Sequence, residues 1–242
     1  MIDTLFFSLT CILHHPNNSA LNQYGKLNAV ESMRQRLLNI GVEINYESLL
    51  EGFHLPFTKQ RKRLKESTKH IALSDLLISA IGKDDLTQYD IEQALAAYFA
   101  SEHFNAYAAP GAHEVLQQLS LNYQCVLIAN SDFPGYCQDM LLERLALKKY
   151  FKRRIYSYDI GIRKPHRGLF WESLRRVGSK SEKTLVIGDS DMRDIQPALE
   201  MGFRAIPFSP FRQPESVVSQ FEFVFSWPQL MKHIDEGKYI TP

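Results

Sequence analysis

The sequence predicts an α/β protein: a parallel β-sheet covered by helices on both faces, with an all-helical domain inserted after the first strand. Three observations carry this prediction. Short apolar runs, typical of strands buried on both faces, recur along the chain. Helical patterns separate the later runs, as parallel pairing requires. The segment after the first run contains hardly any β-branched stretch.

Five apolar runs are the candidate strands. The first, from Leu5 to Leu13, is broken only by Ser8 and Thr10 and is bounded by polar residues. The others are Cys125–Ala129, Thr184–Ile187, Arg204–Phe208 and Glu222–Phe225. Aromatic residues alternate around the last run, at Phe221, Phe223, Phe225 and Trp227, which predicts a final strand followed by its turn.

Helices are predicted between these strands. Pro110 fits the first position of a helix over residues 110–122. Apolar spacings of three and four predict further helices at Tyr136–Leu147, His166–Val177 and Met192–Met201. Gly178 and Gly202 follow the last two helices, where a C-cap falls.

Residues 15–109 are predicted to form a helical insert. Its expected helices are Leu21–Ile40, Tyr46–Leu64, Thr68–Ile81 and Thr87–Asn105, with Thr87 and Asp90 as candidate caps for the last. We therefore expect a core domain of residues 1–14 and 110–242 and a cap domain of residues 15–109. Ligands of open α/β sheets bind outside the carboxyl ends of the strands, so we expect the cap to act there as a lid.

Composition excludes several classes of protein. The 242 residues carry 28 Lys plus Arg against 27 Asp plus Glu, without the basic excess expected of a nucleic-acid-binding or membrane-surface protein. No apolar run approaches the ~20 residues that span a bilayer, and the N-terminus lacks the pattern of a signal peptide. The three cysteines, Cys11, Cys125 and Cys137, have no metal-ligand spacing, which favours a reducing, cytoplasmic setting.

The most specific local signal is a pair of aspartates after the run at 184–187. Asp189 ends the predicted strand and Asp194 follows five residues later in the first helical turn. Two carboxylates aimed at one point are ligands for a hard cation such as Mg²⁺. The alternative is local: Asp191 caps the helix and Asp194 lies near its positive end.

Two further signals lie where other predicted elements begin or end. Lys164 precedes Pro165, which favours an extended conformation that directs the ammonium away from the following helix. There it could bind a phosphate or carboxylate, or pair with Asp189 or Asp194; the alternative is an ordinary surface lysine before a helix. Asn130 and Ser131 follow the strand at 125–129 and could bond an oxyanion, although both residue types are also common turn formers.

In order and spacing these segments resemble the haloacid dehalogenase-like (HAD) superfamily of phosphatases and dehalogenases. The segments are APGAHEVLQQL, VLIANSD, the stretch from LLERLALKKYF through IRKPHRGLFWESLRRVG, and TLVIGDSDMRDIQPALEMGFRAI. The resemblance implies a Rossmann-like core with a helical cap inserted after the first strand. It also implies Mg²⁺ as cofactor and site positions at Asn130, Lys164, Asp189 and Asp194.

The first strand departs from the family pattern. Family members carry an aspartate nucleophile and, two residues later, an acid/base aspartate. Here Ser8 occupies the nucleophile position and Thr10 the acid/base position. In the second motif, Ala129 replaces a phosphoryl-binding hydroxyl residue, and Ser131 lies on the same strand face if the strand continues that far. A missing anionic ligand also weakens the expected binding of Mg²⁺ at Asp189 and Asp194.

Two functions remain open. The first is a non-catalytic HAD-like protein whose cleft binds a small anion through Asn130, Ser131 and Lys164, or binds a protein partner, with Lys164 held in a buried ion pair. The second is an unusual hydrolase in which either Ser8 attacks or water held by a metal on Asp189 and Asp194 does so.

One feature of the predicted cap stays separate from these functions. Residues 59–65 form a basic cluster, KQRKRLK. Such a cluster is either a solvated helix face or a surface for a phosphate-bearing or acidic partner.

Overall fold

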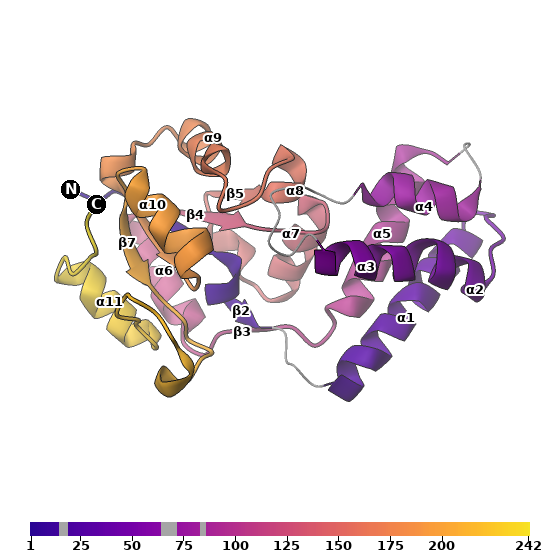
Figure 1. The fold of residues 1–242 in the computed structure, drawn as a ribbon, viewed down its shortest axis with the longest axis horizontal. Helices are drawn as coiled ribbons and strands as arrows, with labels where there is room; N and C mark the ends of the chain where they lie inside the picture. Colours follow the sequence, from indigo (N-terminus) through magenta and orange to yellow (C-terminus); the bar gives the residue numbers. More distant parts are fainter. Residues whose placement is uncertain (15–18, 64–71, 83–85) are drawn as a thin grey trace. The chain divides into compact units, whose positions relative to one another are not determined.

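A computed structural model describes residues 1–14, 19–63, 72–82 and 86–242 of the chain, with the side chains of residues 19–27 left aside. Its main sheet confirms the predicted α/β class. Five strands lie in the order β5-β4-β1-β6-β7, and every neighbouring pair is parallel (Figure 1). Their bounds are β1 Thr4–Ser8, β4 Gln124–Ala129, β5 Arg153–Tyr156, β6 Thr184–Gly188 and β7 Arg204–Pro207.

The central strand is β1, and its register decides what meets at the carboxyl edge of the sheet. Ser8 pairs with Ile128 of β4, and Phe7 pairs with Ile187 of β6. The chain segments that follow β1, β4 and β6 therefore leave the sheet side by side. In open α/β sheets this edge is where ligands bind.

The predicted first strand, Leu5–Leu13, is too long. After Ser8 the chain turns through a 3-10 helix, Leu9–Cys11, and then forms β2, Leu13–His14, which pairs antiparallel with β3, Tyr107–Ala108. The turn keeps Leu9 and Cys11 buried while exposing Thr10. A continuous apolar run thus conceals the end of a strand, because the following turn is equally buried.

The predicted strand at Glu222–Phe225 is wrong. Only an isolated parallel bridge joins Val224 to Phe208, and the chain then enters helix α11, Trp227–Asp235, with Ser226 as N-cap. Trp227 is buried against Phe208, with ring centroids 4.9 Å apart. Of the four alternating aromatic residues only Trp227 is buried in the core, whereas Phe221, Phe223 and Phe225 are half-buried and form no strand. The sequence analysis also missed β5, whose first two residues are arginines.

Helices pack against the strands in the pattern expected of this class: α6 Ala112–Asn122, α8 Ser157–Ile160, α9 Arg167–Val177 and α10 Gln196–Glu200. A further helix, α7, spans Gly135–Arg144. Pro110 does not begin α6, because Gly111 precedes the helix in the left-handed region at φ 82°. The helix predicted at Met192–Met201 is divided into a π-helix, Asp191–Ile195, and α10.

Alternate residues of β1 pack into different parts of the core. Phe6 belongs to a buried cluster that includes Phe170 of α9, Ala198 of α10 and Phe203. Phe7 points to the other face and packs against Trp227 of α11, with ring centroids 6.2 Å apart. Both phenylalanines are at most 1% exposed, so β1 is fixed from both sides and holds Ser8 at its end.

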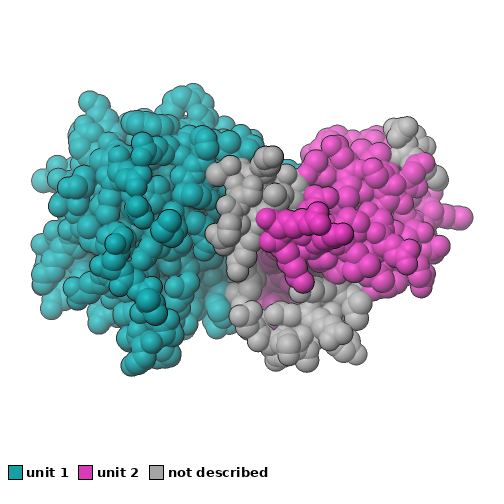
Figure 2. All heavy atoms as spheres, viewed as in Figure 1, with its two compact units in different colours: residues 1–14, 107–131, 142–242 teal, residues 15–106, 132–141 magenta. Residues whose placement is uncertain are grey.

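Contact clustering divides the chain into one unit of residues 1–14, 107–131 and 142–242 and a second unit of residues 15–106 and 132–141 (Figure 2). The second is helical, with α1 Ser19–Leu38, α2 Tyr46–Leu49, a π-helix Leu50–His54, α3 Leu55–Arg63, α4 Leu73–Ile81 and α5 Gln88–Glu102. Thr87 and Asp90 form a capping box on α5, as expected. The predicted domain boundary at residue 109 stays a prediction. Helix α1 begins two residues before the predicted start at Leu21 and ends two residues before Ile40, whereas the start predicted at Thr68 and the end predicted at Leu64 lie outside the described residues.

Arg61, from the basic cluster at 59–65, forms ion pairs within the helical unit. Its guanidinium pairs with Glu102 at 2.5 Å and with Asp132 at 2.8 Å and lies over the ring of Phe57. Lys62 and Arg63 are exposed, whereas Leu64 and Lys65 lie outside the described residues.

Among the helices that the structure describes, none is long and apolar enough to cross a membrane.

Candidate functional site

The polar residues that the sequence singled out meet at the carboxyl edge of the main sheet. Ser8 ends β1, Asn130 follows β4, and Asp189 follows β6. Lys164 comes from the loop between α8 and α9, and Asp194 from the π-helix after β6. The structure thus brings together five side chains that are up to 186 residues apart in sequence, as expected from the parallel topology.

Lys164 is the centre of this arrangement. Its ammonium donates to Asp194 Oδ1 at 2.5 Å, to Ser8 Oγ at 3.1 Å and to the carbonyl oxygen of Ile128 at 3.1 Å. An ammonium has three donors, and all three have acceptors here. Lys164 is only 5% exposed and Asp194 only 2%. The ion pair predicted between Lys164 and either Asp189 or Asp194 is formed with Asp194.

The Asn130 side chain holds the backbone of Lys164. Asn130 Nδ2 donates to the Lys164 carbonyl oxygen at 2.9 Å, and the Lys164 backbone N–H donates to Asn130 Oδ1 at 2.8 Å. Both ends of the amide are therefore engaged with the same residue. Asn130 positions Lys164 in this structure, whereas the sequence analysis placed it as a ligand for an oxyanion.

Asp194 fits tightly against the end of β6. Its Oδ2 accepts from the Ser190 backbone N–H at 3.2 Å. A Cβ atom on Gly188 would lie 2.3 Å from the Asp194 Cβ, so only glycine allows this approach. Ser190, rather than Asp191, caps the following helical turn by accepting from the Arg193 N–H.

Hydroxyl groups link Asp189 to the end of β1. Thr10 Oγ1 donates to Asp189 Oδ1 at 2.6 Å, and Thr10 Oγ1 lies 3.2 Å from Ser8 Oγ. Burial raises the pKa of Asp189, and the neighbouring Asp194 carboxylate raises it further, while Thr10, Lys164 and Arg212 act in the opposite direction. Thr10 thus stabilises a carboxylate that its surroundings disfavour.

Ser131 lies past the end of β4, which stops at Ala129. It is 2% exposed, and its backbone N–H donates to Ser157 Oγ at 2.9 Å. The Ser157 hydroxyl in turn donates to the Ser131 carbonyl oxygen at 3.3 Å. Ser131 is therefore tied to α8 through its backbone, and its N–H is not available for an anion.

Arg212 is a site residue that the sequence analysis missed. It lies in the loop after β7, and its guanidinium is 3.9 Å from Asp189 Oδ2. The signal that could have found it is its position: a cation soon after a strand of a parallel sheet lies near the carboxyl edge. β7 is the edge strand, however, and sequence spacing alone did not show that the loop returns toward β6.

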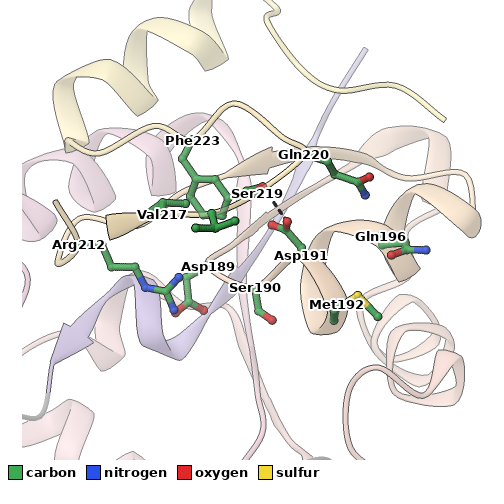
Figure 3. A pocket seen from close by; sticks show the side chains of 11 residues that line it. Asp189, Ser190, Asp191, Met192, Gln196, Arg212, Val217, Ser219, Gln220 and Phe223 are labelled. Carbon is green, nitrogen blue, oxygen red and sulfur yellow. Dashed lines mark hydrogen bonds and ion pairs between the residues drawn. The ribbon is translucent and has the colours of Figure 1, made fainter. Parts of the chain in front are cut away.

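An open pocket of about 560 Å³ lies beside Asp189 in the same unit. Its lining combines charged and apolar groups: Asp189, Asp191, Met192, Arg212, Val217 and Phe223. Figure 3 shows Arg212 next to Asp189 and Ser219 turned toward Asp191, whose carboxylate accepts from the Ser219 hydroxyl at 2.7 Å. A compact ligand with polar and apolar parts fits such a lining.

The donor set does not fit a Mg²⁺ site built mainly from carboxylates. Among the described residues, no group of three or more His, Cys, Asp and Glu side chains is disposed to hold a metal ion. Both oxygens of Asp194 already accept hydrogen bonds, and Asp189 Oδ1 accepts from Thr10. Ser8 supplies a neutral hydroxyl already in contact with the Lys164 ammonium.

Comparisons with known proteins agree with this fold. A sequence model described as haloacid dehalogenase-like hydrolase matches residues 19–207. Over 211 residues the chain is 26% identical to a protein named glyceraldehyde 3-phosphate phosphatase from Methanocaldococcus jannaschii, a match covering 84% of this chain and 82% of the relative.

Two solved structures share the fold. A 2-haloacid dehalogenase from Pseudomonas syringae matches with a TM-score of 0.66 at 20% identity, covering 98% of this chain and all of the other. The HAD-hydrolase YfnB from Bacillus subtilis, in a form bound to magnesium, matches with a TM-score of 0.58 at 17% identity, covering 97% of this chain and 99% of the other.

Proposed function

Because the chain belongs to the haloacid dehalogenase-like hydrolase family, we propose that it keeps the family site as a binding site and does not carry out aspartyl-phosphate phosphatase or dehalogenase chemistry. The ligand we propose is a small anion. The single observation that carries this proposal is the set of contacts around Ser8, the residue at the family's nucleophile position.

Ser8 lacks a base. A serine hydroxyl attacks efficiently only when a neighbouring group removes its proton. The group nearest to Ser8 Oγ at the site is the ammonium of Lys164, 3.1 Å away, which donates to Ser8 and is paired with Asp194. The other neighbour, Thr10 Oγ1, is a second hydroxyl. Neither group takes up a proton from Ser8 at neutral pH.

Thr10 cannot replace an acid/base aspartate. Its hydroxyl proton is already given to Asp189 Oδ1 at 2.6 Å, and an alcohol is far too weak an acid to protonate a leaving group as a carboxylic acid does. Loss of an essential nucleophile typically lowers turnover by about 10⁶-fold. The family model match begins at residue 19, after β1, which is consistent with a first strand that departs from the family pattern.

The pocket beside Asp189 supports a binding role. Arg212 supplies an exposed cation at its wall, and Val217 and Phe223 supply apolar surface. With Lys164 fully engaged by internal acceptors, Arg212 is the residue that we propose as the anchor for an anionic ligand. We also propose that Mg²⁺ binds weakly at Asp189 and Asp194, because their oxygens have partners within the protein.

A hydrolase is the second candidate, and the printed name of the relative from M. jannaschii favours it. In that case either Ser8 attacks, or water held by a metal on Asp189 and Asp194 does so. A protein partner could also occupy the site in place of the small anion. Competition between that partner and inorganic phosphate would detect it.

The test combines turnover and binding. Wild type, Ser8→Ala and Asp189→Asn are assayed with a panel of phosphomonoesters and 2-haloacids, with Mg²⁺ and with EDTA, and inorganic phosphate binding is measured by calorimetry. We expect phosphate binding without turnover. Turnover that Ser8→Ala or Asp189→Asn abolishes would overturn the proposal in favour of the hydrolase.

A further inference from the structure

Each carboxylate oxygen at the site has a partner within the chain. Asp194 Oδ1 faces Lys164 and Oδ2 faces the Ser190 N–H, at 2.5 and 3.2 Å. Asp189 Oδ1 accepts from Thr10 at 2.6 Å, and Asp189 Oδ2 lies 3.9 Å from the Arg212 guanidinium. Two positive side chains, Lys164 and Arg212, therefore face two negative ones, Asp194 and Asp189.

Arg212 is brought to this place by fixed contacts at the end of β7. The Phe208 backbone N–H donates to the Gly188 carbonyl oxygen at 2.8 Å, which ties the loop after β7 to the end of β6. Three residues later, Phe211 stacks on His14 with ring centroids 4.7 Å apart and meets the edge of Tyr107. Both contacts precede Arg212 in the sequence and hold the segment that leads to it.

The two cations differ in access. The Lys164 side chain is 4% exposed, whereas that of Arg212 is 47% exposed and lines the pocket. Figure 3 shows the guanidinium of Arg212 alongside the Asp189 carboxylate, at the wall of that pocket. An exposed guanidinium with one long ion-pair contact keeps N–H groups for an anion, which Lys164 does not.

We propose that the Arg212 guanidinium takes the place of a divalent cation at Asp189, so that this site binds its anion without a metal. Mg²⁺ needs oxygen ligands that it can gather in near-octahedral geometry. Here the oxygen of Asp189 that does not accept from Thr10 faces a fixed positive charge, which repels a second cation. Arg212 at the same time offers the planar donors that suit a phosphate or carboxylate.

This inference rests on the proposed function in one respect: the anion occupies the binding site described above. The exclusion of Mg²⁺ from Asp189 does not depend on that function, because Mg²⁺ binding can be measured with no anion present. Failure of the two proposals can therefore be told apart.

The experiment compares wild type, Arg212→Ala and Arg175→Ala by calorimetric titration with MgCl₂ and, separately, with inorganic phosphate in EDTA. Arg175 is a matched control, an exposed arginine on α9 paired with Glu172. We expect Arg212→Ala to bind Mg²⁺ roughly tenfold more tightly than wild type, since the positive charge 3.9 Å from Asp189 Oδ2 is removed. Phosphate should bind to wild type equally well with and without EDTA. It should bind more weakly to Arg212→Ala than to wild type. Arg175→Ala should match wild type in both titrations.

Several outcomes would overturn the inference. Equal Mg²⁺ affinities for wild type and Arg212→Ala, including undetectable binding to both, would show that Arg212 is not what keeps the cation away. Phosphate binding that is lost in EDTA would show that the site needs a metal. Arg212→Gln serves as a second variant, and the same comparison applies to it. Phosphate binding to none of the proteins would instead reject the proposed anion-binding function.

Discussion

Lys164 and Ser8 face each other across 3.1 Å, with the ammonium donating to the hydroxyl. The same nitrogen is 2.5 Å from Asp194 Oδ1, so the charge of Lys164 is balanced inside the protein. A donor occupies the position at which a nucleophilic serine would need a base. These contacts bury the charged groups of Lys164 and Asp194 together, so the stability of each depends on the other.

Removal of Lys164 should destabilise the protein strongly. Lys164→Met keeps much of the side-chain volume but leaves the Asp194 carboxylate, 2% exposed, without its counter-charge. We expect a loss of about 3 kcal/mol in the free energy of unfolding, as for other broken buried ion pairs. Urea denaturation measures it. The control is Lys164→Met/Asp194→Asn, which should lose less than the single variant; an equal or larger loss would contradict the charge argument.

Carboxylates introduced at residues 8 and 10 should strengthen metal binding. In Ser8→Asp/Thr10→Asp, one new carboxylate adjoins Lys164 and the other replaces the Thr10 hydroxyl that now contacts Asp189 at 2.6 Å. Crowded carboxylates favour a divalent cation, so Mg²⁺ affinity should rise and weak Mg²⁺-dependent phosphatase activity should appear. Calorimetry and a phosphomonoester assay measure the two effects. A folded variant that shows neither would mean that the pocket has lost more than its first motif.

Substitutions in the basic cluster at 59–65 should differ in their effect on the free energy of unfolding. Arg61→Ala removes the guanidinium that pairs with Glu102 and Asp132, whose side chains are 8% and 16% exposed. Because a third of the Arg61 side chain is exposed, we expect a loss of about 2 kcal/mol, below that of a fully buried pair. Lys62→Ala, on the exposed side of the same helix, should change the free energy of unfolding very little. Equal effects would contradict the internal role of Arg61.

His103 should make the protein sensitive to acid. Burial lowers the pKa of His103 below its ordinary value of 6.5, so the unfolded chain takes up a proton at higher pH than the folded one. The stability that neutral His103 contributes is therefore present above about pH 6.5 and is lost as the pH falls through the lower, folded pKa. The free-energy gap between wild type and His103→Gln should narrow between about pH 7 and pH 5. A constant gap would contradict this assignment.

The sequence predicted the inner strands better than the outer ones. Cys125–Ala129 and Thr184–Ile187 lie within β4 and β6, because strands buried on both faces are continuous apolar runs. β5 escaped notice because it lies at the edge of the sheet and begins with Arg153 and Arg154. The helix predicted at Met192–Met201 is divided where Asp194 packs onto Gly188, and hydrophobic periodicity does not reveal that contact.

The sequence likewise predicted some of the site residues and not others. Lys164, Asp189 and Asp194 stand beside predicted strand ends or helix starts, so parallel topology was enough to place them together. The part played by Asn130 depends on which backbone it meets, and that of Arg212 depends on the bond between Phe208 and Gly188. Both are contacts between segments distant in sequence, formed only when the chain folds.

The most direct test is whether phosphorus becomes attached to the first strand. Wild type and Ser8→Ala are mixed with excess phosphomonoester, quenched, digested and analysed by mass spectrometry, with Ser120→Ala on α6 as control. The account predicts that the peptide containing Ser8 keeps its unmodified mass in all three proteins. A phosphoryl group found on that peptide in wild type and Ser120→Ala, and missing from Ser8→Ala, would contradict it.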